Sequence, residues 1–243
     1  ENEADGAYIR GAMKRGGLCG VDVELRTLAE NVSADGLAQA LEAVNSDNGI
    51  HGCLLLRPLP GHLKAMESKL CALLDPKKDV DGMTPVSAAG VFTGSGQGFP
   101  PCTAQACMAL LDYYHIDSAG KSATVVGRSA VVGRPAAMLL LARNATVTVC
   151  HTGTKDVAAV TREADIIITA AGAAGSLTAA HVRPGQVVVD VSTNWNGVSL
   201  CGDAVFDDVS QIVEAITPVP GGVGAVTSAV LMAHTVRAAE GCL

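Results

Sequence analysis

Apolar and polar residues follow two alternating periods along the second half of the chain. Short, nearly continuous apolar runs are typical of strands buried on both faces, and four of them occur at 122–127, 145–150, 166–171 and 187–191. Apolar residues repeat at helical spacing over 133–143 and 155–163. Strands and helices that alternate across short turns form a mostly parallel sheet covered by helices. The pattern therefore predicts an α/β domain built on such a sheet, followed by a helix near 225–240.

The first half of the chain shows a less regular alternation. The pattern predicts strands at 21–28 and 50–56 and helices at 33–45 and 62–74. Aspartate, proline and glycine predict a loop over 75–90, and a helix is expected at 103–115. The opening residues look helical but follow no strand, so we expect that an N-terminal strand and helix are missing.

The loop at 75–101 and the helix after it indicate a boundary between two α/β domains. We expect a first domain over 1–108 and a second over 109–224.

Charge and composition exclude several classes of function. The net charge is −7 and no lysine or arginine run occurs, so we expect no nucleic-acid partner. No apolar run reaches the length of about 18 residues that a membrane span needs, and the acidic opening residues do not resemble a signal peptide. The eight cysteines contain no CxxC pair and the six histidines are scattered. We therefore expect reduced thiols, no metal site and a cytoplasmic protein.

The turn after the strand at 122–127 carries a possible nucleotide site. A strand, Gly127 and a helix near Gly133 form the arrangement that places phosphates at a helix N-terminus, although the spacing is not GxGxxG. The next strand ends at Cys150–Thr152 without the acidic residue that usually holds an NAD ribose. Arg128 and the hydroxyls of Ser129 and Thr152 could instead bind the 2′-phosphate of NADP. The alternative is a surface arginine at a helix start.

Several segments together resemble one known family. They read PKKDVDG (76–82), PPCTAQA (100–106), GRSAVVGRP (127–135), ATVTVCHTGT (145–154), ADIIITAAG (164–172) and ITPVPGGVGAVT (216–227). In this order, and over nearly the whole chain, they are similar to the methylenetetrahydrofolate dehydrogenase/cyclohydrolase family (FolD).

The resemblance implies a fold, a reaction and partners. It implies two α/β domains flanking a cleft, the first (1–108) joined by the C-terminal helix 225–243. The second (109–224) is implied to be a Rossmann-type domain that binds NADP and forms a homodimer. The implied reaction oxidises 5,10-methylenetetrahydrofolate to 5,10-methenyltetrahydrofolate with NADP⁺. Many members then add water to form 10-formyltetrahydrofolate, a step of the one-carbon metabolism that supplies purine biosynthesis.

The resemblance also implies site residues. Asp81 matches an aspartate that binds the pterin, and its alternative is a residue that shapes the turn before Gly82. Tyr8 matches a tyrosine that lies along the folate ring, and its alternative is a half-buried core residue. The loop with Pro220, Gly221 and Gly222 is expected beside folate, its alternative being an ordinary helix-entry turn. The expected cofactor-binding residues are Gly127, Arg128, Ser129, Gly133, Thr152, Gly172, Thr193 and Gly222.

Two positions depart from the family pattern. Ala12 stands where the family has a lysine that assists water addition, and Leu56 stands where it has the glutamine that contacts this lysine. We therefore expect a dehydrogenase with weak or absent cyclohydrolase activity. One alternative is a bifunctional enzyme that uses a relocated pair of Lys14 and Arg57. Another is a relative that binds folate or nucleotide without turnover.

Overall fold

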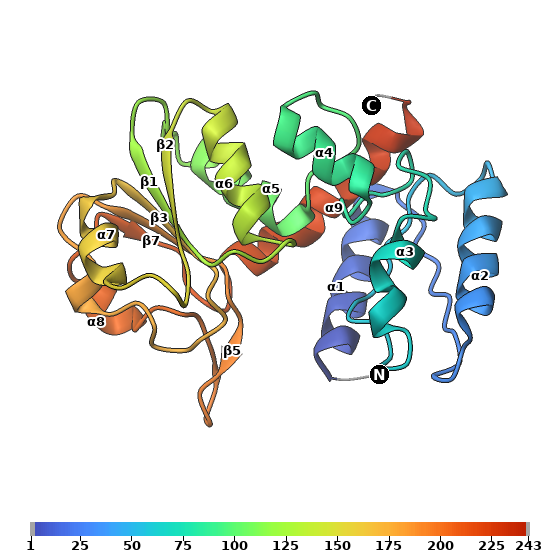
Figure 1. The fold of residues 1–243 in the computed structure, drawn as a ribbon, viewed down its shortest axis with the longest axis horizontal. Helices are drawn as coiled ribbons and strands as arrows, with labels where there is room; N and C mark the ends of the chain where they lie inside the picture. The colour runs from blue at the N-terminus through green and yellow to red at the C-terminus, as the bar shows by residue number, and fades with distance from the viewer. Residues whose placement is uncertain (1–2, 242–243) are drawn as a thin grey trace. The chain divides into compact units, whose positions relative to one another are not determined.

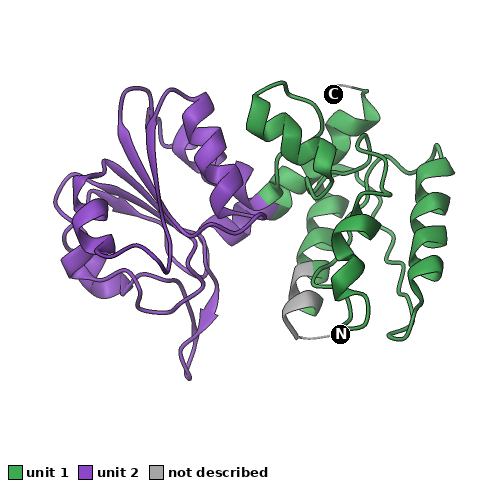
Figure 2. Ribbon diagram, in the orientation of Figure 1, with its two compact units in different colours: residues 1–102, 228–243 green, residues 103–227 purple. Residues whose placement is uncertain are grey.

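The structure, a computed structural model, describes residues 3–241, without the side chains of residues 3–5, 7 and 8. The chain divides into two compact units (Figure 2). Unit 1 comprises residues 1–102 and 228–243, and unit 2 comprises residues 103–227. The C-terminal segment therefore returns to the first unit.

Unit 2 is built on a parallel sheet with the strand order β2-β1-β3-β4-β7. The central strand β3 has all four residues buried, because the sheet is covered on both faces. Figure 1 shows α6 on one face and α7 and α8 on the other. The strands are β1 (Ser122–Val126), β2 (Thr146–Cys150), β3 (Ile166–Thr169), β4 (Val187–Asp190) and β7 (Ala215–Ile216).

The helices of unit 2 agree with the predicted alternation. A hairpin of β5 (Asn194–Trp195) and β6 (Leu200–Cys201) and a 3₁₀ turn at Ala179–His181 complete the unit. The short helix α8 was not predicted, since its five residues are too few to show a period. The helices are α5 (Cys102–Tyr113), which begins in unit 1, α6 (Gly133–Ala142), α7 (Val157–Glu163) and α8 (Phe206–Ser210).

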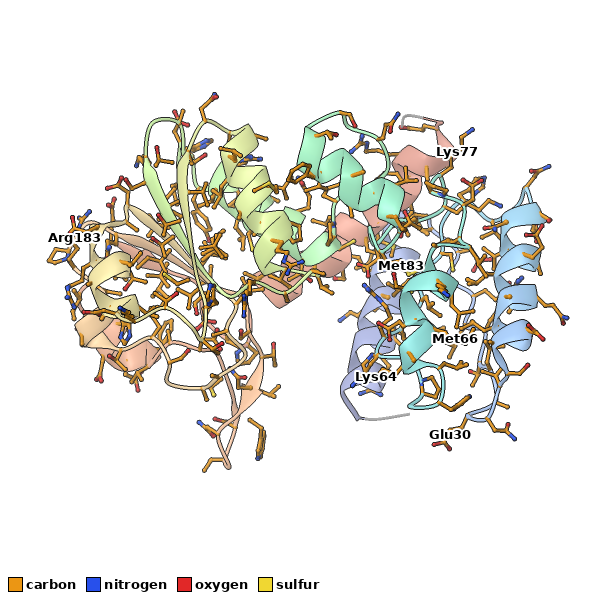
Figure 3. All side chains as sticks on the ribbon, viewed as in Figure 1. Glu30, Lys64, Met66, Lys77, Met83 and Arg183 are labelled. Atoms are coloured by element: carbon orange, nitrogen blue, oxygen red, sulfur yellow. The ribbon has the colours of Figure 1, made fainter. Side chains whose placement is uncertain are left out.

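In unit 1, helices and the segments between them pack together through a cluster of buried apolar side chains. Leu37 and Leu41 of α2 pack in one cluster with residues of the following segment such as Leu63 and Leu70. The N-terminus of α2 is capped by the Ser33 hydroxyl, which accepts a hydrogen bond from the Gly36 N–H at 3.1 Å. Charged side chains, including Glu30, Lys64 and Lys77, are exposed (Figure 3). The helices are α1 (Glu3–Cys19), α2 (Ala34–Ser46), α3 (Glu67–Cys71), α4 (Pro85–Thr93) and α9 (Val223–Ala239), with a 3₁₀ turn at Lys64–Met66.

The predicted strands at 21–28 and 50–56 are wrong for the described chain. A strand is defined by backbone pairing, and the backbone of residues 22–28 makes no hydrogen bond with other described residues. Residues 51–56 make one, from the Cys53 N–H to the Lys78 carbonyl at 2.7 Å. An apolar run suits a buried strand, but it forms one only where a neighbouring backbone is present.

The predicted loop over 75–90 also needs correction, because α4 begins within it at Pro85. Thr84 caps this helix, and proline suits its first turn because the missing N–H would have no helical partner there. Helix 62–74 is likewise shorter than predicted and consists of the 3₁₀ turn and α3.

Lys78 closes the C-terminus of α2. Its Nζ donates to the carbonyls of Val44, Asn45 and Asp47 at 2.7, 2.9 and 2.7 Å. These carbonyls have no partner within the helix, and the ammonium also complements the negative end of the helix dipole. The contact therefore joins α2 to a loop more than thirty residues away.

We expect Lys78→Met to lower the free energy of unfolding by about 1–3 kcal/mol, because Met keeps the apolar stem and removes only the charged donor. Chemical denaturation monitored by circular dichroism measures the change. Lys77→Met is the matched control, because Lys77 is exposed and its side chain makes no hydrogen bond with described residues. Equal stability of the two variants would contradict the capping role.

Candidate functional site

The residues predicted to bind the cofactor lie at one edge of the sheet in unit 2. The strands are parallel, so their carboxyl ends meet at the same edge. In open α/β sheets this edge is where ligands bind. The predicted residues follow the strands in turn, with Gly127 after β1, Thr152 after β2, Gly172 after β3, Thr193 after β4 and Gly222 after β7.

Gly127 occupies the point where the strand order reverses. The chain places β2 on one side of β1 and β3 on the other, so the switch lies between β1 and β3. Gly127 has φ 128°, and a Cβ atom there would collide with the Ala170 carbonyl that follows β3. A Cβ atom on Gly133 would collide with the Gly127 carbonyl. Both glycines are therefore required for the backbone to turn so closely at this edge.

The turn between Gly127 and α6 presents donors to solvent. The Ser129 hydroxyl accepts from the N–H groups of Val132 and Gly133 at 3.1 and 3.3 Å, so it holds the start of α6. The N–H groups of residues 128–131 make no hydrogen bond with other described residues. The Arg128 side chain is exposed and also has no partner among the described residues. A free cation and free N–H groups fit the phosphates of a dinucleotide.

The buried carboxylate of Asp203 ties the neighbouring loops together. Its Oδ2 accepts from the Thr169 hydroxyl, the Ala171 N–H and the Ser192 hydroxyl at 2.9, 2.7 and 2.8 Å. Its Oδ1 accepts from the Ala173 N–H and the Asn194 amide at 2.8 and 3.0 Å.

Asp203 therefore fixes the two segments that carry Gly172 and Thr193. Ser192 strengthens the link, since its hydroxyl also accepts from the Gly172 N–H at 3.1 Å. Sequence reasoning gave Asp203 no role, because its partners lie up to 34 residues away. An aspartate between apolar residues was the one available signal, since a buried carboxylate needs hydrogen bonds.

A second buried carboxylate, Asp190, supports the same region. Asp190 at the end of β4 accepts from the N–H groups of Asp203 and Ala204 at 3.1 and 2.8 Å. Burial raises the pKa of Asp190 to about 6, although these hydrogen bonds oppose the rise.

The proline- and glycine-rich loop after β7 closes the same edge. Pro220 and Gly221 are exposed, and Gly221 has φ 104°, which favours glycine. Gly222 is buried, and a Cβ atom there would collide with the Pro218 carbonyl. Gly221 and Gly222 are therefore required by the backbone conformation and close packing of this loop. An ordinary turn before a helix does not need two such residues.

In unit 1, Asp81 lies in a tight turn and faces a cation. Its Oδ2 is 3.8 Å from Nη2 of Arg57, and the two side chains are 20% and 21% exposed. Burial raises the pKa of Asp81, and the nearby Arg57 cation lowers it in part.

The turn itself is held by Asp79, not by Asp81. The buried Asp79 carboxylate accepts from the N–H groups of Met83 and Thr84, both at 2.8 Å. Asp81 is therefore not needed for the hydrogen bonds that shape this turn, which leaves its carboxylate available for a ligand.

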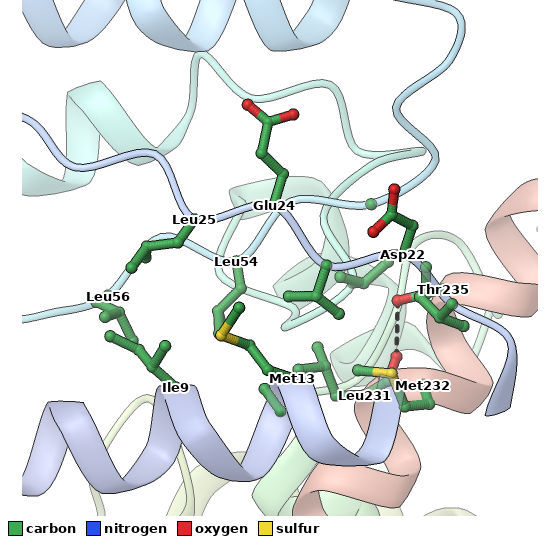
Figure 4. A pocket seen from close by; sticks show the side chains of 15 residues that line it. Ile9, Met13, Asp22, Glu24, Leu25, Leu54, Leu56, Leu231, Met232 and Thr235 are labelled. Carbon is green, nitrogen blue, oxygen red and sulfur yellow. Dashed lines mark hydrogen bonds between the residues drawn. The ribbon is translucent and has the colours of Figure 1, made fainter. Parts of the chain in front are cut away.

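Ala12 and Leu56, the two positions expected to depart from the family pattern, line one cavity in unit 1. The cavity has a volume of about 160 Å³ (Figure 4). Its lining also includes the apolar Leu54 and Met232 and the polar Asp22, Glu24 and Thr235. The sequence interpretation therefore paired two positions that the fold does bring together.

The other predicted residues of unit 1, Tyr8 and Lys14, have no described contact with Asp81 or Arg57. Tyr8 lies in α1, but its side chain is outside the described residues. Lys14 is exposed, and no contact joins it to Arg57. The relocated pair therefore has no direct support in the structure.

Two family descriptions match the chain. The catalytic domain of tetrahydrofolate dehydrogenase/cyclohydrolase matches residues 1–81, and its NAD(P)-binding domain matches residues 101–242. The chain belongs to this family. The bifunctional protein FolD of Carboxydothermus hydrogenoformans is 47% identical over 236 residues, which cover 96% of this chain and 82% of the relative.

Solved structures of the tetrahydrofolate dehydrogenase/cyclohydrolase family share the fold. The bifunctional FolD of Campylobacter jejuni has a TM-score of 0.95 at 40% identity, covering 100% of this chain and 86% of that one. FolD of Trypanosoma brucei, solved with NADP cofactor and inhibitor, has a TM-score of 0.91 at 32% identity, covering 98% and 83%.

These findings confirm the predicted family, α/β fold, enzyme class and NADP cofactor. The individual site residues and the domain boundaries remain predictions. Among the described residues no helix is both long and apolar enough to cross a membrane. The same part of the chain holds no group of three or more His, Cys, Asp or Glu side chains placed for a metal ion.

We expect Asp203→Asn to weaken NADP⁺ binding and to lower the free energy of unfolding by about 1–3 kcal/mol. Either position of the new amide nitrogen would face N–H or O–H donors that now point at a carboxylate oxygen. NADP⁺ titration by intrinsic fluorescence and thermal unfolding measure the two effects. Asp208→Asn on the exposed side of α8 is the control and should change neither. Unchanged NADP⁺ affinity in Asp203→Asn would contradict the anchoring role.

Proposed function

We propose that this chain oxidises 5,10-methylenetetrahydrofolate with NADP⁺ and also hydrolyses the 5,10-methenyltetrahydrofolate that forms. The observation that carries the proposal is the match to both domains of the family, the catalytic domain over 1–81 and the NAD(P)-binding domain over 101–242. Unit 1 then holds Tyr8 and Asp81 for the folate. Unit 2 holds the cofactor residues and also the loop at 220–222 that is expected beside the folate. The predicted homodimer through unit 2 belongs to the proposal as well.

The second activity differs from the sequence prediction. Weak or absent cyclohydrolase activity is not supported by the comparisons, because the similar relatives are named bifunctional. The bifunctional alternative fits them better. Lys14 and Arg57 are less suited than expected to act as its relocated pair, since Lys14 is exposed and Arg57 faces Asp81.

In the dehydrogenase step the chain positions the reactants more than it transfers protons. NADP⁺, when bound, supplies the hydride acceptor. The Asp81 carboxylate accepts hydrogen bonds from the pterin edge and so orients the carbon that gives up hydride. Arg57 beside it favours the ionised form that accepts such bonds. On unit 2, the turn at 128–131 and Gly222 hold the cofactor, and Pro220 and Gly221 lie beside the folate.

Arg128 is proposed to select NADP over NAD. Its side chain is exposed and unpartnered within the described chain, and no acidic residue follows β2 at 150–152. The guanidinium can therefore bind the 2′-phosphate without breaking an existing contact.

We expect Arg128→Ala to raise the KM for NADP⁺ more than about tenfold, because a charge-assisted hydrogen bond to phosphate contributes roughly 1.5–3 kcal/mol. The KM for NAD⁺ should barely change. Steady-state absorbance of the reduced cofactor measures both. Arg134→Ala, on α6, is the matched control for loss of a nearby cation. Equal use of both cofactors by the unmutated protein would exclude the proposed selection.

A dehydrogenase without the second activity is the other candidate, and the cavity lined by Ala12 and Leu56 favours it. Methyl and isobutyl groups cannot activate water or move a proton. At these two positions the chain therefore offers no polar group, although Asp22, Glu24 and Thr235 also line the cavity.

The two candidates are separated by supplying methenyltetrahydrofolate and following its decay against the uncatalysed rate. We expect decay that depends on the enzyme, as a bifunctional protein requires. Decay at the uncatalysed rate, from protein that still oxidises methylenetetrahydrofolate, would leave only the dehydrogenase. Lys14→Ala and Arg57→Leu then test the relocated pair, since only a working pair would lose the decay in both variants.

A further inference from the structure

His234 is a buried polar residue in the apolar helix α9. Its side chain is 3% exposed, and a buried polar group needs a hydrogen-bond partner. The ring Nδ1 lies 2.9 Å from the carbonyl oxygen of Val80. A carbonyl only accepts, so Nδ1 must carry the hydrogen. Burial lowers the pKa of His234 and so favours the neutral ring, although the hydrogen bond to Val80 raises it in part.

The same carbonyl receives a second donor. The Cys102 thiol donates to the Val80 oxygen at 3.2 Å, and its Sγ lies 3.7 Å from His234 Nδ1. A carbonyl oxygen has two lone pairs, so both donors can be accommodated. The ring is also held in place by Phe99, whose centroid is 4.8 Å from that of His234 at an interplanar angle of 31°.

The Val80 carbonyl belongs to the peptide bond that leads into Asp81, so its hydrogen bonds constrain the backbone that carries the Asp81 carboxylate. The peptide bond between Val80 and Asp81 is planar, so a carbonyl held by two donors also holds the Cα of Asp81. On the other side Gly82 has φ 66°, and a Cβ atom there would collide with the backbone of Phe99 and Pro101. The backbone of Asp81 is therefore constrained from both sides.

We propose that His234 is a positioning residue for folate, which acts through the Val80 carbonyl to aim the Asp81 carboxylate at the pterin. The inference rests on the proposed function, because it takes Asp81 as the pterin-binding residue. It assigns to α9 a specific part in substrate orientation beyond its packing in unit 1. A carboxylate displaced by about 1 Å can lower the rate up to a hundredfold.

The test compares His234→Leu with His234→Asn. Leu fills much of the ring volume without a donor, whereas the Asn amide can place an N–H near the position of Nδ1. We expect His234→Leu to raise the KM for methylenetetrahydrofolate about tenfold, as loss of a hydrogen bond to a buried carbonyl implies. The KM for NADP⁺ should stay unchanged. His234→Asn should retain most of the folate affinity.

Val230→Ala is the matched control, because it removes buried volume from the same helix and leaves the donor intact. Thermal unfolding of each variant reports on stability. An unchanged folate KM in His234→Leu would overturn the proposal. Equal impairment of the Leu, Asn and Val230 variants would also overturn it, since packing alone would then explain the effect.

Two further variants complete the test. Should His234→Leu not fold, His234→Met replaces it, because Met also lacks a donor and fills a similar volume, and it should raise the folate KM in the same direction. No change would then overturn the proposal. Asp81→Asn separates this inference from the proposed function. Normal folate turnover in Asp81→Asn would mean that Asp81 does not bind the pterin, whereas lost turnover there with a normal His234→Leu would defeat only the positioning role.

Discussion

The structure of unit 2 depends on the close contact between the backbone that leaves β1 at Gly127 and the backbone that leaves β3 at Ala170. The Ala170 N–H donates to the Val126 carbonyl at 2.7 Å, and the next residue along β1 must be glycine because the Ala170 carbonyl occupies the space of a Cβ atom. This contact sets the switch in strand order at the edge where the predicted cofactor residues gather. A side chain at Gly127 would push the strands apart and displace the turn that presents Arg128.

Buried carboxylates hold the loops that connect strands and helices in both units. Asp79 and Asp203 are both fully buried, and each accepts hydrogen bonds from backbone N–H groups and from at least one hydroxyl. Burying such a group is costly unless its oxygens are satisfied, so the loop that satisfies them is held in one conformation. One of these loops carries Asp81, and the others carry Gly172 and Thr193. Rigid loops of this kind suit a reaction that depends mainly on orientation.

The cavity in unit 1 brings together Ala12 and Leu56, which lie on separate segments of the chain. Both side chains are apolar, whereas Asp22, Glu24 and Thr235 supply polar groups to the same lining. The bifunctional FolD of C. hydrogenoformans shares 47% of the sequence. The proposed hydrolysis of methenyltetrahydrofolate therefore rests on such relatives and not on Ala12 and Leu56.

The sequence by itself determined the features whose physical cause is local. Strands buried on both faces are mainly apolar, so β1, β3 and β4 could be predicted from short, nearly continuous apolar runs. Gly127, Gly133 and Gly222 could be anticipated, because sharp turns after strands require residues without a Cβ atom. Features that depend on a partner far away in the sequence, such as strand pairing and long-range hydrogen bonds, were decided by the tertiary structure alone. The runs at 21–28 and 50–56 look like strands but lack a paired backbone in the described chain. The bond from His234 to Val80 spans 154 residues, and the five donors to Asp203 come from two separate segments, so no local pattern could reveal either.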